Sequence, residues 1–345
     1  MEKTPGPTKI ALVVGPWEGL QGQPSWFYPY LSKWHLAVLF FGTRVAQFKL
    51  SPRVITISFR DSLRAFTSLS KLGIKVVLCR GVINGIMACV LARFTSKKPT
   101  IVIQDFIGSI AWARRYANRI ILRQLFSPVS LALCYTNEEK DAWVDIVGGT
   151  KVKLLEIGVS PSDYVMPTSD QGYIFSGGRS RRDFGTLFKA VSGVKARVFV
   201  AADYDPFDGK LHVPHAVPNN VRVELKLTQK EFKLRMAHCS FVVVPLTSTS
   251  LAAGSEVVLQ AMAMGKAVIA TSNPGVANYV SDGETGFLIP PADSDTLRSR
   301  IELLLRNRQL TQVVGDNGRR RVVSLSFIEV ADQFVQMLTP ILDRG

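Results

Sequence analysis

Cysteine is scarce in this sequence of 345 residues, and long hydrophobic runs are absent. None of the four cysteines forms a C-x-x-C pair, and most lie in or beside apolar segments, as buried thiols do. The two most apolar windows, residues 36–41 and 82–92, are too short to span a membrane. The first residues carry no evident secretory signal. We therefore expect a cytoplasmic protein in a reduced compartment, with at most peripheral contact with the inner face of a membrane.

Acidic residues are also few: 27 Asp and Glu stand against 42 Lys and Arg, which gives a formal net charge of +15. Such an excess attracts phosphates, nucleic acid or anionic lipid but does not determine the fold. The sequence contains no recognisable nucleic-acid-binding module, so we expect no nucleic-acid partner. Apolar residues make up 47% and charged residues 20%, which is enough material for the cores of two ordinary domains.

Short β-branched runs alternate with helical patterns along the first half of the chain. We expect buried strands at residues 10–14, 54–58, 75–79, 100–103, 131–135 and 152–157. Between them, residues 61–72 place Leu63, Phe66 and Leu69 at helical spacing. Alternation of this kind predicts an α/β fold with a parallel, doubly wound sheet.

The alternation stops and then resumes. Residues 158–172 are rich in Gly, Pro, Ser and Asp, which is typical of a linker. A second series of strands is expected at residues 173–175, 197–201, 221–225, 241–244, 267–270 and 287–289. Two α/β domains joined in this way would face each other across a cleft, where ligands bind at the carboxyl ends of the strands.

Two motifs in the second half favour phosphate binding. The loop at residues 252–255 precedes a predicted helix, so that Gly254 and Ser255 would present backbone N–H groups to an anion. A strand at 173–175 runs into Gly177, Gly178 and Arg179, with Arg182 shortly after. The glycines permit a tight turn, and the arginines can neutralise a diphosphate. The alternative interpretations are an ordinary turn and a solvated basic loop.

With these motifs the chain resembles the GT-B glycosyltransferases of the retaining family 4. That family has the patterns A-M-A-x-G-x-x-V-I-A-T and D-G-x-x-G-x-L-V, which residues 260–271 (QAMAMGKAVIAT) and 282–288 (DGETGFL) match well. The resemblance implies two Rossmann-like domains, an acceptor-side domain at 1–165 and a nucleotide-sugar domain at 166–325. A C-terminal helix at 326–345 would complete the first domain. The donor would be a UDP- or GDP-sugar, with Arg179 and Arg182 at its diphosphate.

The family also has a pair of glutamates in the pattern E-x7-E, which this sequence does not match. Gln260 stands in place of the second Glu, and Ala252 in place of the first. Gln260 can still bind a ribose hydroxyl, and Glu256 is the candidate for the catalytic and sugar-binding carboxylate. Its alternative role is to complement the helix dipole. Asp203 and Asp205 form a D-x-D pattern that could hold a divalent metal. We favour a solvated acidic loop there, and expect no metal and no cofactor.

The first half offers weaker signals for the acceptor. Gln104 and Asp105 follow a strand at the position where many family members carry a histidine, and either could contact acceptor hydroxyls or simply cap the loop. Arg115, Arg119 and Arg123 recur every fourth residue on a probable helix beside aromatic residues. Such a surface suits anionic lipid head groups, although arginine stripes are more often solvated.

These observations predict a retaining, metal-independent glycosyltransferase that moves a hexose from a nucleotide sugar to a glycan or lipid-linked acceptor. The departures from E-x7-E leave open a catalytically inactive relative that binds nucleotide sugars. A GT-B epimerase is a further alternative, although it would need cleft carboxylates.

Overall fold

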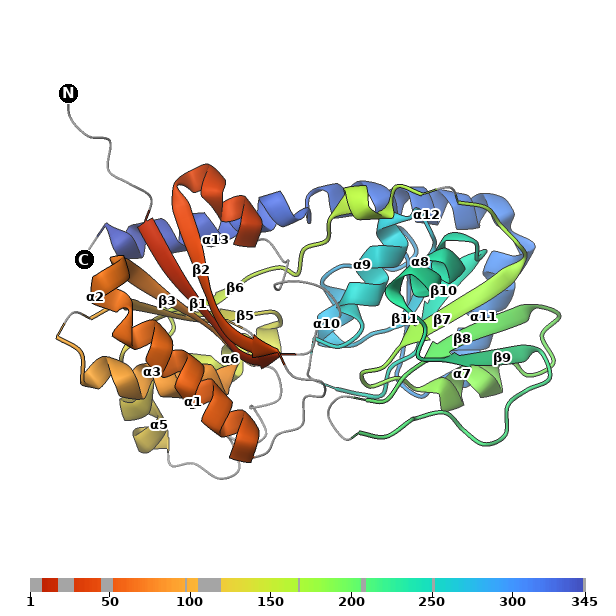
Figure 1. The fold of residues 1–345 in the computed structure, drawn as a ribbon. Helices are drawn as coiled ribbons and strands as arrows, with labels where there is room; N and C mark the ends of the chain where they lie inside the picture. Colours follow the sequence, from red (N-terminus) through yellow and green to blue (C-terminus); the bar gives the residue numbers. More distant parts are fainter. Residues whose placement is uncertain are drawn as a thin grey trace. The chain divides into compact units, whose positions relative to one another are not determined.

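The computed structural model describes residues 8–17, 28–44, 52–96, 98–104, 119–166, 168–205, 209–249 and 252–343. The chain divides into two compact units, Ile157–Ser326 and a unit made of Met1–Glu156 with Phe327–Gly345. Each unit contains a six-stranded sheet whose paired strands are all parallel, with helices on both faces (Figure 1). The predicted α/β class and the two doubly wound parallel sheets are confirmed.

The first sheet has the order β2-β1-β3-β4-β5-β6. Its strands are β1 (Thr8–Trp17), β2 (Leu36–Arg44), β3 (Ile74–Arg80), β4 (Thr100–Gln104), β5 (Val129–Cys134) and β6 (Val152–Leu154). The central strands are buried on both faces, as parallel strands covered by helices must be. One face is covered by α1 (Pro52–Thr67), α2 (Leu69–Leu72), α3 (Val82–Arg93), α5 (Arg119–Leu125) and α6 (Asn137–Val147).

One predicted strand is wrong. Residues 54–58 belong to helix α1, although their β-branched composition favours a strand. The buried residues from Ser58 to Phe66 fall at positions 58, 61, 62, 65 and 66, which is helical spacing, and Pro52 opens the helix. The strand that completes the sheet is instead β2, which pairs with β1 and which we did not predict.

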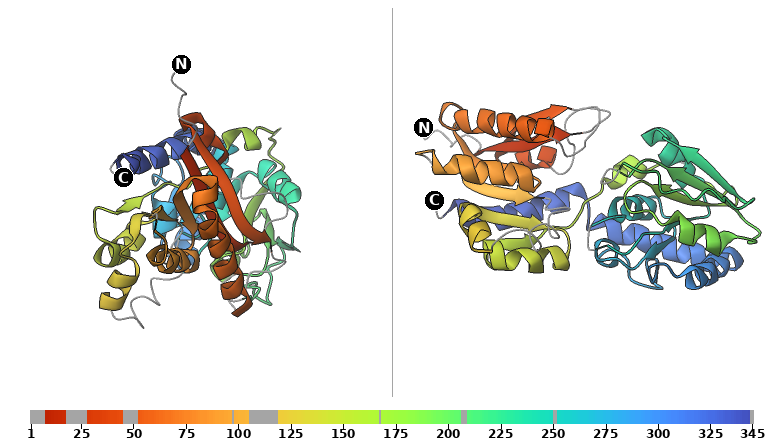
Figure 2. Two further views of the ribbon diagram at one scale, coloured as in Figure 1. Left: turned by 60° about the vertical axis from the view of Figure 1, so that its left-hand side comes forward. Right: turned by 90° about the horizontal axis from the view of Figure 1, so that it is seen from below.

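Helix α13 (Phe327–Leu342) packs on the other face of the first sheet (Figure 1 and Figure 2). Val330, Ala331, Phe334 and Leu338 are buried there with Leu131 and Leu133 of β5. The 3₁₀ helix η1 (Tyr28–Trp34) lies beside it, and the rings of Tyr30 and Phe327 are 6.5 Å apart. Two stretches far apart in the sequence therefore share one core.

The second sheet has the order β12-β11-β10-β7-β8-β9. Its strands are β7 (Tyr173–Gly178), β8 (Arg197–Ala202), β9 (Val221–Leu225), β10 (Phe241–Val244), β11 (Val268–Thr271) and β12 (Phe287–Ile289). The helices are η2 (Pro161–Tyr164), α7 (Phe184–Val191), α8 (Gln229–Ala237), α9 (Ser255–Ala263), α10 (Pro274–Ala277), α11 (Ser294–Arg306) and α12 (Arg308–Val323). All six strands lie where the sequence predicts them.

The segment that we expected to be a linker begins inside the second unit. Val159 donates its N–H to Leu325 O over 2.9 Å and pairs with Ser326, and Tyr164 is buried against α9. The division between the units therefore falls at Glu156 and Ile157, nine residues before the end at 165 that the sequence suggested.

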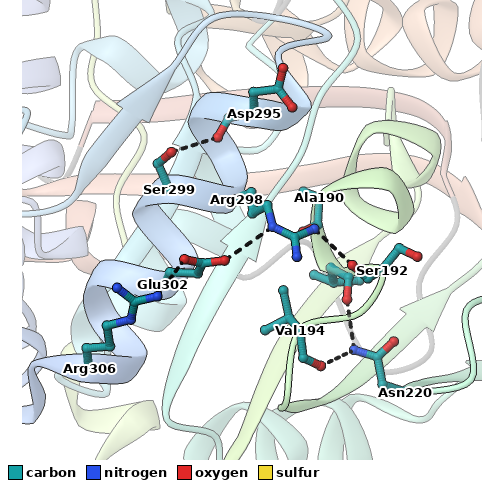
Figure 3. A network of polar contacts seen from close by, with 10 residues as sticks. Ala190, Ser192, Val194, Asn220, Asp295, Arg298, Ser299, Glu302 and Arg306 are labelled. Atoms are coloured by element: carbon teal, nitrogen blue, oxygen red, sulfur yellow. Dashed lines mark hydrogen bonds and ion pairs between the residues drawn. The ribbon is translucent and has the colours of Figure 1, made fainter.

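A polar network fixes the turn between α7 and β8 (Figure 3). Arg298 of α11 donates to Ser192 O over 2.8 Å and pairs with Glu302 over 3.2 Å. Asn220 donates to Val194 O and Ala196 O over 3.1 and 3.0 Å. These bonds satisfy carbonyls at the end of α7 and hold residues 192–196 in one conformation.

Candidate functional site

The two predicted phosphate-binding motifs meet at one edge of the second sheet. Gly177 and Gly178 are the last residues of β7, and Gly254 begins α9 after β10. Strands β7 and β10 are parallel neighbours, with Val243 opposite Ser176. Their carboxyl ends lie side by side, and ligands of doubly wound sheets bind at such ends.

The β7 loop is folded around a buried arginine. Arg182 is 5% exposed and donates from Nε to Gly177 O over 2.8 Å and from its terminal nitrogen to Ser180 O over 3.1 Å. Gly178 has φ of 120°, and a Cβ there would collide with the Arg182 guanidinium. Arg182 thus holds the loop from inside, a role that the sequence did not suggest.

Burial and nearby carboxylates set the electrostatics of Arg182. Burial lowers the pKa of Arg182 to about 10, while the carboxylates of Glu256 and Asp205 oppose this shift. Glu256 is therefore close enough to Arg182 to interact with it, although the two come from different motifs. By contrast, Arg179 is exposed at the end of β7, whereas Arg181 of the same loop is half-buried. The diphosphate contacts of Arg179 and Arg182 remain predictions.

Both acidic residues of the D-x-D pattern accept hydrogen bonds from backbone N–H groups. Asp205 is 2% exposed and accepts the N–H of Arg181 over 2.9 Å, and Asp203 accepts the N–H of Tyr204 over 2.8 Å. Asp205 thereby fixes Arg181, which has φ of 57°. This cross-link joins the loop after β8 to the loop after β7.

The amino-terminal end of α9 is built for close approach. Gly254 is the N-cap residue with φ of 87°, and a Cβ there would lie 2.7 Å from Leu246 Cδ1. As a glycine, Gly254 has no side chain with which to cap the helix, and Ser255 is fully buried with its hydroxyl donating to Ala252 O over 2.9 Å. The first N–H groups of α9 have no acceptor within the helix and can bind a ligand or water.

Glu256 and Gln260 are paired on the same helix. Gln260 Nε2 donates to Glu256 Oε1 over 3.2 Å, and Glu256 is exposed. Burial raises the pKa of Tyr164, and the Glu256 carboxylate raises it further, which places Tyr164 near the same group. The structure therefore places a carboxylate, an amide and helix N–H groups at the start of α9, while Arg179 follows the neighbouring strand β7. Groups of these kinds can bind hydroxyls and a diphosphate.

In the first unit, the buried side chain of Gln104 is hydrogen-bonded to two tyrosines. Gln104 is 0% exposed, its Oε1 accepts the Tyr28 hydroxyl over 2.7 Å, and its Nε2 donates to the Tyr135 hydroxyl over 3.0 Å. Asp105 lies outside the described residues. Neither tyrosine was a candidate from the sequence, although Tyr28 falls in an aromatic segment and Tyr135 directly follows β5.

The arginine stripe is partly engaged within the protein. Arg119 pairs with Asp145 over 3.3 Å, Arg123 donates to Asp145 O over 2.7 Å, and Arg115 lies outside the described residues. On the same helix, α5, Ile120 and Ile121 are 63% and 62% exposed. Within the described ranges, no helix combines the length and the apolar character that crossing a membrane requires.

Comparison with known proteins identifies the fold as GT-B, the two-domain fold of a large class of glycosyltransferases. Sucrose-phosphate synthase of Thermosynechococcus elongatus is 15% identical over 98% of this chain and 100% of its own, with a TM-score of 0.74. Anabaena HepE, solved in complex with UDP-glucose, is 15% identical over 96% of this chain and 99% of its own, with a TM-score of 0.66.

The sequence comparison points to one part of the chain. The model of the family described as Glycosyl transferases group 1 matches residues 214–321, most of the second unit. An uncharacterized glycosyltransferase of Methanocaldococcus jannaschii is 35% identical over 119 residues, which are 32% of this chain and 33% of that protein. The match thus spans about a third of this curated relative. The resemblance drawn from the motifs is confirmed at the level of group 1 glycosyltransferases.

Proposed function

We propose that this protein is a glycosyltransferase that transfers a hexose from a nucleotide sugar to an acceptor hydroxyl. The observation that carries the proposal is the convergence of the β7 loop and the α9 amino terminus at one sheet edge, with Arg179 and Glu256 exposed there. This edge lies within the unit that the group 1 family matches. The UDP-glucose complex of the structural neighbour HepE supports a UDP-sugar as the first donor to test.

In this proposal Arg179 and the first N–H groups of α9 bind the donor diphosphate. They stabilise the negative charge that grows on the leaving nucleoside diphosphate as its oxygen separates from the anomeric carbon. Glu256 and Gln260 bind hydroxyls of the sugar and the ribose. Fixed donors of this kind take the charge-neutralising role of a divalent metal, so we propose that turnover continues in EDTA.

We further propose that the anomeric configuration is retained. The acceptor oxygen forms its bond to the anomeric carbon on the face from which the diphosphate leaves, and a donor phosphate oxygen takes the acceptor proton. No separate general base is then required. The carboxylate of Glu256 then serves in binding and orientation, since it accepts a hydrogen bond from Gln260 and interacts electrostatically with Arg182.

For the acceptor we propose a glycan or a lipid-linked intermediate reached from the cytoplasmic face of a membrane. Helix α5 exposes Ile120 and Ile121 next to Arg119 and Arg123. Apolar and basic side chains on one short helix suit the boundary between acyl chains and anionic head groups.

The test is nucleoside diphosphate release from a panel of UDP- and GDP-sugars in EDTA, with and without a bacterial lipid extract. We expect release from one donor, stimulated by lipid, with Arg179→Ala lowering kcat/KM at least tenfold because a charge-assisted contact is worth about 1.5–3 kcal/mol. Arg306→Ala, which removes an equally charged surface residue of the same unit, is the matched control and should change nothing. Release that requires Mn²⁺ would refute metal independence.

The departures at Gln260 and Ala252 favour one competing function, a nucleotide-sugar-binding protein without turnover. This function would be established if calorimetry showed that the protein binds a donor while no nucleoside diphosphate is released with any lipid. The turnover of the Gln260→Glu variant, which restores the carboxylate, should then be measured. A gain of turnover would identify the missing carboxylate as the cause of inactivity.

A further inference from the structure

A polar cavity of about 480 Å³ opens at the edge of the second sheet opposite the candidate donor site. The residues just before four strands line it: Gly172 before β7, Ala196 before β8, Ser240 before β10 and Lys266 shortly before β11. The candidate donor site lies at the carboxyl ends of the same strands. Because β7 has six residues at a rise of about 3.3 Å each, the two edges are roughly 20 Å apart. The cavity is therefore a separate place on the unit.

Positive charge is in excess in this cavity. The cationic lining residues are Lys195, Lys266, Arg308 and Arg319, and the acidic ones are Asp170 and Asp316. Hydroxyl and amide groups of Ser169, Ser240, Thr311 and Gln312 lie among them. A volume of this size falls in the range that holds a small metabolite.

Lys266 is the buried member of the set. It is 8% exposed, and its ammonium donates to Cys239 O over 2.7 Å and to Ser169 O over 3.4 Å. An ammonium has three donors, and these two carbonyls take two of them. Burial lowers the pKa of Lys266, and the nearby Asp170 opposes this effect. An anion in the cavity would compensate for the cost of this burial.

The cations of the cavity are only partly balanced by carboxylates: against the effect of burial, hydrogen bonds from Ser240 and Gly172 and the charges of Arg308 and Lys266 lower the pKa of Asp170. Lys195, Arg308 and Arg319 are exposed and make neither a hydrogen bond nor an ion pair within the described part of the chain. The backbone around Lys195 is fixed by Asn220 through the network of Figure 3. Asp170 is already engaged, since its Oδ1 accepts the Gly172 N–H over 2.8 Å and the Ser240 hydroxyl over 2.6 Å.

We propose that this cavity binds the phosphate group of a phosphorylated, hydroxyl-bearing small molecule. Lys266 forms the floor of the site, Lys195, Arg308 and Arg319 neutralise the phosphate from its rim, and the hydroxyl and amide side chains bind the rest of the ligand. Arginine provides the forked, charge-assisted contacts that phosphate oxygens accept. The site is independent of the donor site and of the transfer reaction.

The experiment is calorimetric titration of the full chain with glycerol 3-phosphate and, separately, with inorganic phosphate. The cavity variant carries Arg308→Gln with Arg319→Gln, and the control carries Lys189→Gln with Lys230→Gln, which remove the same charge from exposed positions of the same unit. We expect one molecule of glycerol 3-phosphate per chain. Its affinity should fall at least tenfold in the cavity variant and stay within twofold in the control.

Arg179→Gln separates the two edges of the sheet, because it removes a cation from the candidate donor site alone. Binding that survives Arg179→Gln but not the cavity variant supports the proposal. Absence of binding, equal weakening in the control pair, or loss in Arg179→Gln alone would overturn it. A third arm uses phosphatidylglycerol vesicles: vesicle binding that depends on Arg308 and Arg319, with no response to either soluble phosphate, would assign the cations to a lipid surface instead.

Discussion

Replacing Arg182 with methionine removes a guanidinium that two backbone carbonyls of the β7 loop depend on. Methionine keeps most of the side-chain length but cannot donate a hydrogen bond, so Gly177 O and Ser180 O lose their partners. A buried acceptor without a donor costs about 1–3 kcal/mol. Removing the buried charge returns part of this, because the charge itself is costly to bury. We expect the free energy of unfolding of the second unit to fall by about 2–4 kcal/mol.

The positions of the tryptophans allow this loss to be assigned to one unit. All five, at positions 17, 26, 34, 112 and 143, belong to the first unit. Tryptophan fluorescence in a urea titration therefore follows the first unit, whereas far-ultraviolet circular dichroism follows both. With a slope of about 1–3 kcal/mol per molar urea, the second unit should lose about 1–2 M in its midpoint. The fluorescence midpoint should stay where it is.

Arg179→Met is the matched control for this experiment. Arg179 is exposed on the same loop, so its replacement should change stability by no more than about 0.5 kcal/mol while weakening donor binding. An unchanged dichroism midpoint in Arg182→Met would refute the reasoning, because the guanidinium would then not support the loop. Equal stability losses at positions 179 and 182 would refute it as well.

Three further predictions use other parts of the molecule. Gly254→Ala should lower donor affinity at least tenfold, because the Cβ of the new alanine would lie 2.7 Å from Leu246. The control is Gly283→Ala, which has a similar φ but open space around it and should leave the affinity unchanged. Phe334→Ala should destabilise the first unit by about 3–5 kcal/mol and shift the fluorescence transition, since the ring is fully buried; a shift of the second unit alone would contradict this. All four cysteines should resist a thiol reagent at pH 8 in the native protein and react in urea, because they are buried. Burial raises the pKa of Cys239, for example, to about 12. Rapid labelling of the native protein would contradict this, since it would show an accessible thiol.

Most of the strand pattern could be predicted from the sequence because parallel strands covered on both faces are continuous apolar runs. Residues 54–58 show the limit of that rule. Their composition is that of a strand, but a neighbouring run, residues 36–44, occupies the place beside β1, and residues 52–67 bury one side as a helix. Composition alone does not decide which of two adjacent apolar segments pairs.

At the candidate site, the sequence predicted which segments come together but not which arginine faces outward. Arg179 and Arg182 are both arginines of the loop after β7, and the sequence does not distinguish their roles. Only the fold shows that Arg182 is turned inward, toward Gly177. The hydrogen bonds of Gln104 could not be predicted either, because its partners, Tyr28 and Tyr135, are 76 and 31 residues away in the sequence. Contacts over such separations leave no local pattern to read.

The return of α13 to the first sheet has a consequence for the order in which the protein is made. Ile157–Ser326, 170 residues, is synthesised between β6 and the helix that covers the face formed by Leu131 and Leu133. At about 5–20 residues per second, that face waits roughly 10–30 s for Phe334. The second unit is continuous in the chain, so all of its residues are made before Phe334, and the first unit is the last to receive a part of its core. A chain that ends at Ser326 should therefore bind an apolar dye that the complete protein does not, because the face of Leu131 and Leu133 has no cover.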